Sequence, residues 1–243
     1  MHIYQCQLTL HDNVFFATRE MGTLYETEKY LHNWALTYAF FSETHIPRPY
    51  RMKGVKAQKP GYLDPDHEQN LLQVNESGLY LFPARPVRWN FQVNTFKSAQ
   101  VNYYGRSKQF GAKGATRNYP INFGRAKELA AGSTYRSYLL SAQALEIATL
   151  PKWIRLGKWA SKIRVSYLPI ADITKKTGLF NCAHPINPID LPASTQLKLY
   201  DRIVMPPVSL VSQARLDGAY WALPDGVCLP ADVAYGVGYV ATA

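Results

Sequence analysis

Several separated stretches of this chain alternate apolar with polar residues, and this pattern constrains the fold more than any other feature. Alternation with a period of two turns one set of side chains toward a core and the other toward water, as in a half-buried strand. Strands are therefore predicted at residues 2–10, 87–95, 134–142, 163–167 and 197–204. In the stretch at 87–95, the polar residues are expected to form the outer face.

Helical spacing is concentrated in one early stretch. Thr23 and Glu26 form a capping-box pattern, in which a hydroxyl and a carboxylate three residues apart satisfy the first free N–H groups of a helix. Apolar residues follow at helical intervals as far as Phe41. The sequence therefore predicts an α+β fold, with one main early helix on an antiparallel sheet and a ferredoxin-like start. We expect residues 1–243 to form a single domain, in which the proline-rich residues 46–70 are a surface connection.

The middle of the chain has an unusual charge pattern. Between Gly78 and Lys127 there is no Asp or Glu, but there are nine Lys or Arg residues and ten aromatic residues. Residues 77–171 carry a net charge of +13, whereas residues 1–76 and 172–243 are close to neutral. Phosphates bind Lys and Arg, and unpaired bases stack on aromatic rings. We therefore predict that a single-stranded nucleic acid binds here, with a solvated basic loop as the competing interpretation.

A basic thumb is predicted inside this region. The strand pattern fails beyond Phe96, where a glycine-rich basic segment begins, and a strand pattern returns near residue 134. Residues 97–132 are therefore expected to form an arm that is rooted in the sheet. Its candidate contacts to the RNA backbone are Lys97, Arg106, Lys108, Lys113, Arg117 and Arg125, and its candidate stacking residues are Tyr103, Tyr104 and Phe110.

The sequence contains none of the common catalytic or metal-binding motifs. There is no P-loop, GxSxG or HExxH, and the three cysteines form neither a zinc spacing nor a disulfide framework. We therefore expect no cofactor, no metal site and no catalytic residue. No run approaches the roughly 18 apolar residues of a membrane span, and the N-terminus lacks a signal-peptide pattern, so a cytoplasmic protein is expected. A metal-independent ribonuclease stays open, because such an enzyme needs only a base, often His or Tyr, and a cation.

Three motifs connect the chain to a known family. They are the opening strand followed by HDNVFFATRE, the stretch YETEKYLHNWAL, and the Leu-Gly-Lys element in IRLGKWASKIRV at residues 154–165. In these motifs the chain resembles the small RAMP subunit of the subtype I-D CRISPR Cascade complex, in the family that caps the crRNA 5′ handle. The resemblance covers nearly the full length, although the thumb matches in charge and position more than in individual residues.

The resemblance implies a RAMP, which is a modified RRM-like ferredoxin fold with a long thumb. It implies a non-catalytic subunit that binds the crRNA 5′ handle and packs against the backbone RAMP subunits and the large subunit of Cascade. It also implies a part in recognising target double-stranded DNA near the protospacer-adjacent motif. Arg19, Arg155 and Lys158 join the candidate RNA-binding residues because they lie in the matching motifs. Processing of precursor crRNA by a metal-independent endoribonuclease is the alternative, because a relative in another subtype cuts that RNA.

Overall fold

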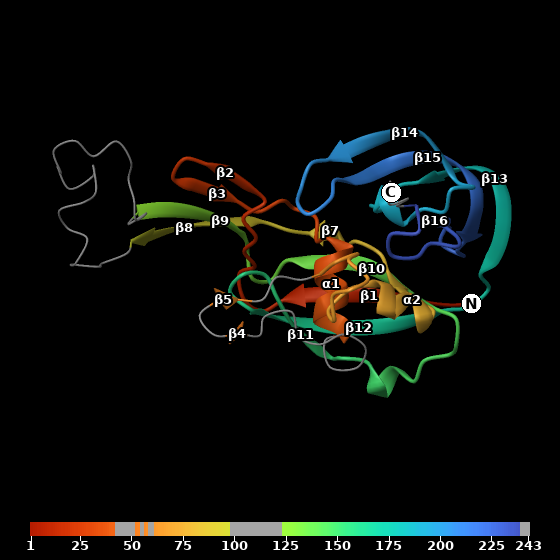
Figure 1. Ribbon diagram of the computed structural model, residues 1–243, viewed down its shortest axis with the longest axis horizontal. Helices are drawn as coiled ribbons and strands as arrows, with labels where there is room; N and C mark the ends of the chain where they lie inside the picture. Colours follow the sequence, from red (N-terminus) through yellow and green to blue (C-terminus); the bar gives the residue numbers. More distant parts are fainter. Residues whose placement is uncertain (42–51, 54–55, 58–60, 98–122, 239–243) are drawn as a thin grey trace.

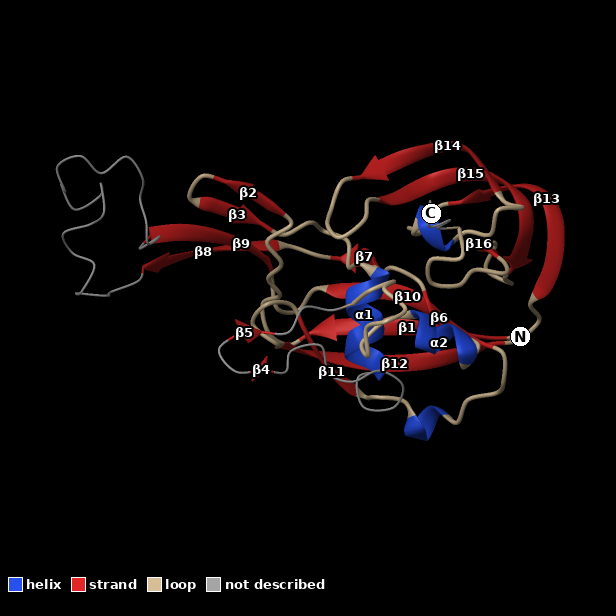
Figure 2. Ribbon diagram, viewed as in Figure 1, coloured by secondary structure: helices blue, strands red, loops and turns tan. Residues whose placement is uncertain are grey.

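The computed structural model of the chain describes residues 1–41, 52–53, 56–57, 61–97 and 123–238. Strands dominate these residues, and the helices among them are short (Figure 2). Three larger sheets make up the fold, together with a small hairpin of β4 (Met52–Lys53) and β5 (Lys56–Ala57). No helix in the described part of the chain is long and apolar enough to cross a membrane.

The largest sheet, which we call the core sheet, is antiparallel and has the order β11-β12-β1-β10-β6, with β7 also paired with β10. Its strands are β1 (His2–Leu10), β6 (Leu79–Leu81), β7 (Arg85–Arg88), β10 (Thr134–Ser141), β11 (Trp153–Leu156) and β12 (Ser161–Ile170). β1 lies at the centre, between β10 and β12. Its residues Cys6 and Leu8 are fully buried, as the alternation predicts. The predicted strands at 2–10, 134–142 and 163–167 are therefore confirmed.

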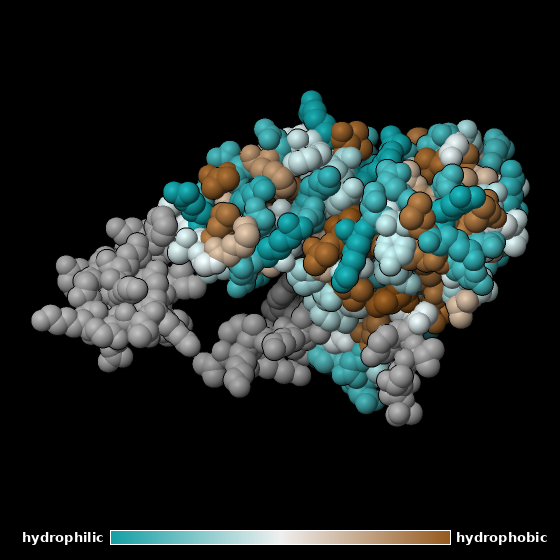
Figure 3. Space-filling view, turned by 90° about the horizontal axis from the view of Figure 1, so that it is seen from above, coloured by the Kyte–Doolittle hydropathy of each residue, from teal (hydrophilic) through white to brown (hydrophobic). Residues whose placement is uncertain are grey.

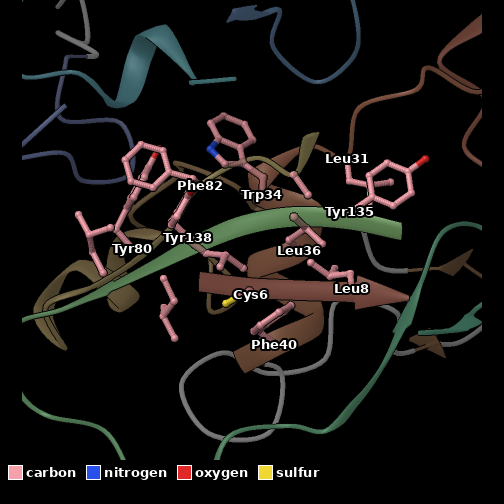
Figure 4. Close-up of a cluster of buried hydrophobic side chains, with 14 of the residues drawn as sticks. Cys6, Leu8, Leu31, Trp34, Leu36, Phe40, Tyr80, Phe82, Tyr135 and Tyr138 are labelled. Carbon is pink, nitrogen blue, oxygen red and sulfur yellow. The ribbon is translucent and has the colours of Figure 1, made fainter. Parts of the chain in front are cut away.

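A single buried helix, α1 (Asn33–Phe41), packs on one face of the core sheet. Figure 4 shows Leu36 and Phe40 among the apolar side chains around Cys6 and Leu8 of β1. Most residues of α1 are buried on every side of the helix, which is the pattern of a helix enclosed by protein and not of a surface helix. A second short helix, α2 (Leu72–Glu76), contacts β6.

The predicted start of the helix is wrong, because Thr23 and Glu26 do not cap one. β2 (Arg19–Met21) and β3 (Leu24–Glu26) instead form a hairpin that turns at Gly22, whose φ of +63° suits glycine. β3 then pairs in parallel with β9 (Phe123–Leu129), which is almost 100 residues away along the chain. This long-range pairing overrides the local capping pattern, and α1 begins only at Asn33.

The predicted strand at 87–95 is divided between two sheets. β7 pairs with β10 in the core sheet, whereas β8 (Phe91–Lys97) pairs with β9. We call the sheet β2-β3-β9-β8 the thumb sheet, and Figure 1 shows it projecting from the body. The expected inner residues Val87, Trp89 and Val93 are 57%, 40% and 53% exposed. The polar residues of this stretch are exposed as predicted, but burial of these three apolar residues is not found, because the chain leaves the core sheet at Trp89.

The C-terminal sheet covers another side of the core sheet (Figure 1). It has the order β13-β15-β14, with β16 also paired with β15. Its strands are β13 (Thr174–Cys182), β14 (Gln196–Ile203), β15 (Leu210–Ala222) and β16 (Cys228–Pro230). β14 confirms the strand predicted at 197–204. Phe180 and Leu216 of this sheet belong to the same buried apolar cluster as β1 and α1, so the two sheets share one core.

A buried carboxylate joins the C-terminal region to α1 and β6. Oδ2 of Asp190 accepts hydrogen bonds from Nδ2 of Asn33 at 2.8 Å and from the hydroxyl of Tyr80 at 2.9 Å. Its Oδ1 accepts one from the backbone N–H of Gly236 at 2.8 Å. Burial raises the pKa of Asp190 to about 6, although these hydrogen bonds act in the opposite direction. The carboxylate thus satisfies three buried donors from three separate parts of the chain.

The last part of the proline-rich segment 46–70 packs against α1. The ring of Tyr62 lies 5.1 Å from that of Trp34, and Gln69 and Asn70 are only 0% and 4% exposed. Both ends of residues 61–70 are therefore packed into the body, whereas residues 64–66 and 68 are exposed as expected of a surface connection. Most of the preceding residues of the segment lie outside the described residues.

Candidate nucleic-acid interface

The strand register places a defined set of side chains on one face of the thumb sheet. One row across the four strands consists of Arg19, Glu26, Lys127 and Val93, and the next row consists of Met21, Leu24, Arg125 and Thr95. We call this surface the thumb face. Figure 3 shows apolar side chains scattered among hydrophilic ones in this part of the molecule. Such a mixture of cations and exposed apolar groups suits a ligand that is both anionic and aromatic.

Two carboxylates partly neutralise the cations of the thumb face. Nη2 of Arg19 lies 2.8 Å from Oε2 of Glu28, and Nζ of Lys127 lies 3.1 Å from Oε1 of Glu26. Within the described part of the chain, Arg125 is an exposed cation with no ion pair. Arg125 is thus ready to contact a phosphate, whereas Arg19 and Lys127 must share or exchange their carboxylate partners to do so.

Two aromatic rings flank these charges, and each has a lysine ammonium near its face. Nζ of Lys127 lies 4.3 Å from the centroid of the Phe91 ring, and Nζ of Lys29 lies 5.8 Å from that of Trp89. The two rings meet edge to face, with their centroids 4.9 Å apart. The exposed ring of Trp89 and the half-buried ring of Phe91, each beside a cation, provide both the stacking surface and the phosphate contacts that single-stranded nucleic acids need.

A hollow of about 220 Å³ lies at the centre of this arrangement. Its walls come from the loop before β2, from β3 and the residues after it, and from the paired strands β8 and β9. The lining residues are Thr18, Arg19, Glu26, Thr27, Glu28, Lys29, Phe91 and Lys127. One wall residue, Thr27, is held in place by two hydrogen bonds to Phe16. Its hydroxyl donates to the carbonyl of Phe16 at 2.8 Å and accepts from the N–H of Phe16 at 3.0 Å. Three cations, Arg19, Lys29 and Lys127, and two carboxylates, Glu26 and Glu28, line the hollow, so its lining is net positive.

The structure brings together some of the residues predicted for RNA binding. Arg19 and Arg125 lie on the thumb face, in neighbouring rows of the same sheet. Lys97 is the last residue of β8 and pairs with Phe123, which places its backbone at the far end of this sheet. The other thumb predictions fall outside the described residues, namely Tyr103, Tyr104, Arg106, Lys108, Phe110, Lys113 and Arg117.

Arg155 and Lys158 lie elsewhere, on the β11–β12 hairpin. Arg155 is exposed, with Nη1 lying 3.9 Å from the Asp12 carboxylate, and Lys158 is an exposed turn residue. The turn packs against the segment that leads to the thumb sheet, because the N–H of Lys158 donates to the carbonyl of Phe15 at 2.8 Å. Trp159 stacks on the ring of Phe15 at 4.5 Å. The Leu-Gly-Lys element therefore supports the root of the thumb sheet without being part of the thumb face.

Substitution of Gly157 by alanine is expected to destabilise the protein. Gly157 has a φ of +81°, and an added Cβ would lie 2.7 Å from the carbonyl oxygen of Phe15. The control is Gly132→Ala, because Gly132 has the same φ but open space around the added Cβ. We expect a loss of about 1 kcal/mol for Gly132→Ala from backbone strain and about 2 to 4 kcal/mol for Gly157→Ala, measured by urea unfolding. Equal losses would contradict close packing of the hairpin on Phe15.

Sequence reasoning missed the residues that form the centre of the site. The alternating stretch predicts that Trp89 and Phe91 turn inward, and the helical spacing places Lys29 in the early helix. Lys127 lies in the acid-free stretch, where nothing in the sequence distinguishes it from the other bases. Trp89 lies where the chain passes from the core sheet to the thumb sheet, and the places of Phe91 and Lys127 depend on the pairing of β8 with β9, so the sheet pairing is needed to find them.

The residues that the structure describes hold two histidines in the buried body. They contain no cluster of three or more His, Cys, Asp or Glu side chains that could hold a metal ion. Two of the histidines, His32 and His184, are 3% and 2% exposed and lie in the body. Burial lowers the pKa of His32 to about 4 and that of His184 to about 3, so both are neutral at pH 7. These two imidazoles serve the core and do not face the thumb sheet.

Comparison with known proteins gave one match in sequence. The family model described as "Type I-D CRISPR-associated protein Cas5/Csc1" matches residues 1–238. A search of curated proteins found no match.

Two solved structures resemble the fold at low sequence identity. A CRISPR protein from Archaeoglobus fulgidus is 11% identical, with a TM-score of 0.41, over 94% of this chain and 98% of that chain. A chain of the type III-B Cmr-beta complex bound to cognate target RNA and AMPPnP is 7% identical, with a TM-score of 0.45, over 88% of this chain and 86% of that chain. At similarities this low, the family assignment depends on the sequence match alone.

Proposed function

We propose that this chain, which belongs to the family of type I-D CRISPR-associated proteins Cas5/Csc1, is the subunit of a CRISPR effector complex that binds the 5′ handle of the crRNA. The family match agrees with the resemblance seen in the sequence motifs and establishes a CRISPR role. The handle, its binding site and the absence of catalysis are the parts that we propose.

The observation that carries the proposal is the composition of the thumb face. Trp89 and Phe91 present rings beside lysine ammonium groups, and Arg125 adds a cation without a carboxylate partner among the described residues. A handle is single-stranded, so its bases are free to stack on rings while its phosphates meet cations. The thumb face also borders residues 98–122, which contain a further four of the predicted cations, so the handle would continue along the thumb.

The arrangement of the body supports a RAMP core. Along the chain, β1 is followed by α1, then β6, β10 and β12, and the order in the sheet is β12-β1-β10-β6. This is the strand order of a ferredoxin-like sheet, with the second crossover made without an α-helix. We propose that this core is a modified RRM-like fold with residues 97–132 as its thumb.

The remaining partners follow from the family and are part of the same proposal. Backbone RAMP subunits and the large subunit of the complex would pack against this subunit, and target double-stranded DNA would pass near it at the protospacer-adjacent motif. The separated distribution of charge supports such an arrangement, since the near-neutral terminal regions are suited to protein contacts.

Purified protein incubated with handle RNA and with full repeat RNA tests this proposal. We expect binding of the handle with a steep dependence on salt, because each phosphate contact on a single strand contributes about 0.7 to the slope of log K against log salt. We expect repeat RNA to stay intact both with Mg²⁺ and with EDTA, as judged on a denaturing gel. Discrete cleavage in EDTA that disappears when one Tyr or His is changed would establish the endoribonuclease instead.

A further inference from the structure

The face of the core sheet opposite α1 contains a second set of cations. The register places Arg88, Thr134, Thr9, Arg164 and Trp153 in one row across five strands, and Arg136, Gln7 and Ser166 in the next row. Cys6, Leu8 and Tyr135 alternate with these residues along β1 and β10, so their side chains lie on the other face of the sheet, toward α1. We call the exposed and half-buried part of this surface the open face.

The open face has no acidic residue of its own. The strands β1, β6, β7, β10, β11 and β12 contain no Asp or Glu at all, but they contain six Arg or Lys residues. Within the described part of the chain, Arg88, Arg136 and Arg164 form no ion pair. The carboxylates that approach the face lie at its margins, with Asp12 beside Arg155 at 3.9 Å and Asp225 in the same hollow as Arg85. The positive charge is therefore left for a ligand to neutralise.

An exposed aromatic residue marks one end of the open face. Trp153 is 45% exposed, and Nζ of Lys162 lies 4.1 Å from its ring centroid. From Arg88 on β7 to Trp153 on β11 the face spans four strand spacings, or about 19 Å. Between its cations lie the side chains of Gln7, Thr9 and Ser166, which donate and accept hydrogen bonds. The C-terminal sheet covers the other end, where Tyr138 meets His184.

We propose that the open face binds a second stretch of single-stranded nucleic acid, separate from the stretch on the thumb face. The charge identifies the ligand as a polyanion, because a surface with unpaired arginines and no acid attracts phosphates. The exposed ring of Trp153 and the hydrogen-bonding row identify unpaired bases as the other part of the ligand, because bases in a duplex present neither their faces nor their pairing edges. The occupant lies across the strands, from Arg88 toward Trp153.

Charge-neutral variants of the full chain test this proposal. The triple change Arg88→Gln, Arg136→Gln and Arg164→Gln removes three cations and keeps long polar side chains on the sheet. The matched control, Lys176→Gln, Lys198→Gln and Arg215→Gln, removes the same charge from exposed positions of the C-terminal sheet. Binding of a labelled oligouridine RNA of roughly ten nucleotides is measured by fluorescence anisotropy over a salt series, and melting temperatures check that both variants are folded.

The open-face variant is expected to lower the slope of log K against log salt by about 2, since each lost phosphate contact on a single strand removes about 0.7. Trp153→Ala is expected to weaken binding about fivefold or more. The same open-face changes made together with Trp89→Ala and Phe91→Ala should multiply the separate losses, because the two surfaces are independent. Equal salt slopes for the open-face variant and its control would contradict the proposal that the open face binds nucleic acid. If the open-face variant lost binding of duplex DNA but bound oligouridine as before, the assignment of a single-stranded ligand would be wrong.

Discussion

Replacing both Trp89 and Phe91 by alanine is expected to weaken binding of the crRNA handle by roughly 30-fold or more. Stacking of a base on an exposed ring contributes about 1 to 3 kcal/mol, so two rings contribute about 2 to 6 kcal/mol. Both rings also hold lysine ammonium groups close to the thumb face, at 5.8 Å for Lys29 and 4.3 Å for Lys127. The double change therefore removes stacking and loosens two cations, and it should act mainly on affinity and only weakly on the salt slope. Titration of labelled handle RNA measures the effect.

The control for this experiment is Leu199→Ala with Tyr200→Ala. These residues lie on β14 of the C-terminal sheet and are 69% and 46% exposed, so the control removes an exposed ring and an exposed apolar side chain away from the thumb face. The control variant should bind handle RNA as the unchanged protein does. If the two double variants bind equally well, the rings of the thumb face do not contact the handle.

The stability of the protein is expected to fall steeply as the pH is lowered from 6.5 to 4. His32 and His184 are buried as neutral imidazoles with a lowered pKa, about 4 and about 3, so the unfolded chain takes up protons before the folded chain does. Their contribution is complete above pH 6.5 and is lost as the pH falls through this range. At one pKa unit per 1.36 kcal/mol, each histidine costs about 3 kcal/mol by pH 4. Urea unfolding at a series of pH values measures the loss.

Burial removes both imidazoles from water and so disfavours their charged form, although a hydrogen bond to a backbone carbonyl raises the pKa of each in part. Nδ1 of His32 accepts from the N–H of Trp34 at 3.1 Å, so Nε2 must carry the hydrogen that faces the carbonyl of Val208. Nε2 of His184 meets the carbonyl of Pro83 at 2.8 Å, while its Nδ1 is buried without a partner. A second proton would therefore face another donor at Nδ1 of His32 and would find no acceptor at Nδ1 of His184. Arg85 and Arg136 lower the pKa of His184 further.

Two variants separate the histidines from other titrating groups. His32→Gln with His184→Gln removes both imidazoles and keeps a donor near each carbonyl, so the remaining stability should depend much less on pH below 6.5. The exposed His2→Gln is the control and should leave the pH profile unchanged. Asp190 acts in the opposite direction, because its raised pKa of about 6 adds up to about 3 kcal/mol as the pH falls from 6 to 4. A pH profile identical in the double variant and the unchanged protein would contradict the assignment.

The central strands of the fold were predictable because their pattern is local. β1 alternates cleanly, since its two faces meet a buried helix and an open surface, and the pairing strands β10 and β12 follow the same rule. The helix start was not predictable, because the residues at 23–26 satisfy a capping pattern yet pair with a strand almost 100 residues away. Long-range strand pairing of this kind overrides the local propensity for a helix.

The candidate site was predictable in its charge but not in its rings. Arg19 and Arg125 could be selected from the sequence because they stand in a family motif and in the acid-free stretch. Trp89 and Phe91 could not be, since an alternating stretch gives the same pattern whether its apolar face meets a core or a ligand. The carboxylates of Glu26 and Glu28 are equally hidden, because the sequence predicts a helix from Thr23 onward, where the structure has β3 and the residues that bring these carboxylates to Arg19.

The measurement that tests the handle site most directly is the position of the handle in the assembled effector complex, determined by electron cryo-microscopy. Handle bases should lie within stacking distance of Trp89 and Phe91, with phosphates beside Arg125 and Lys127, and the strand should continue toward residues 98–122. Density for the handle on another surface, with the thumb face covered by a protein subunit, would contradict the proposed function.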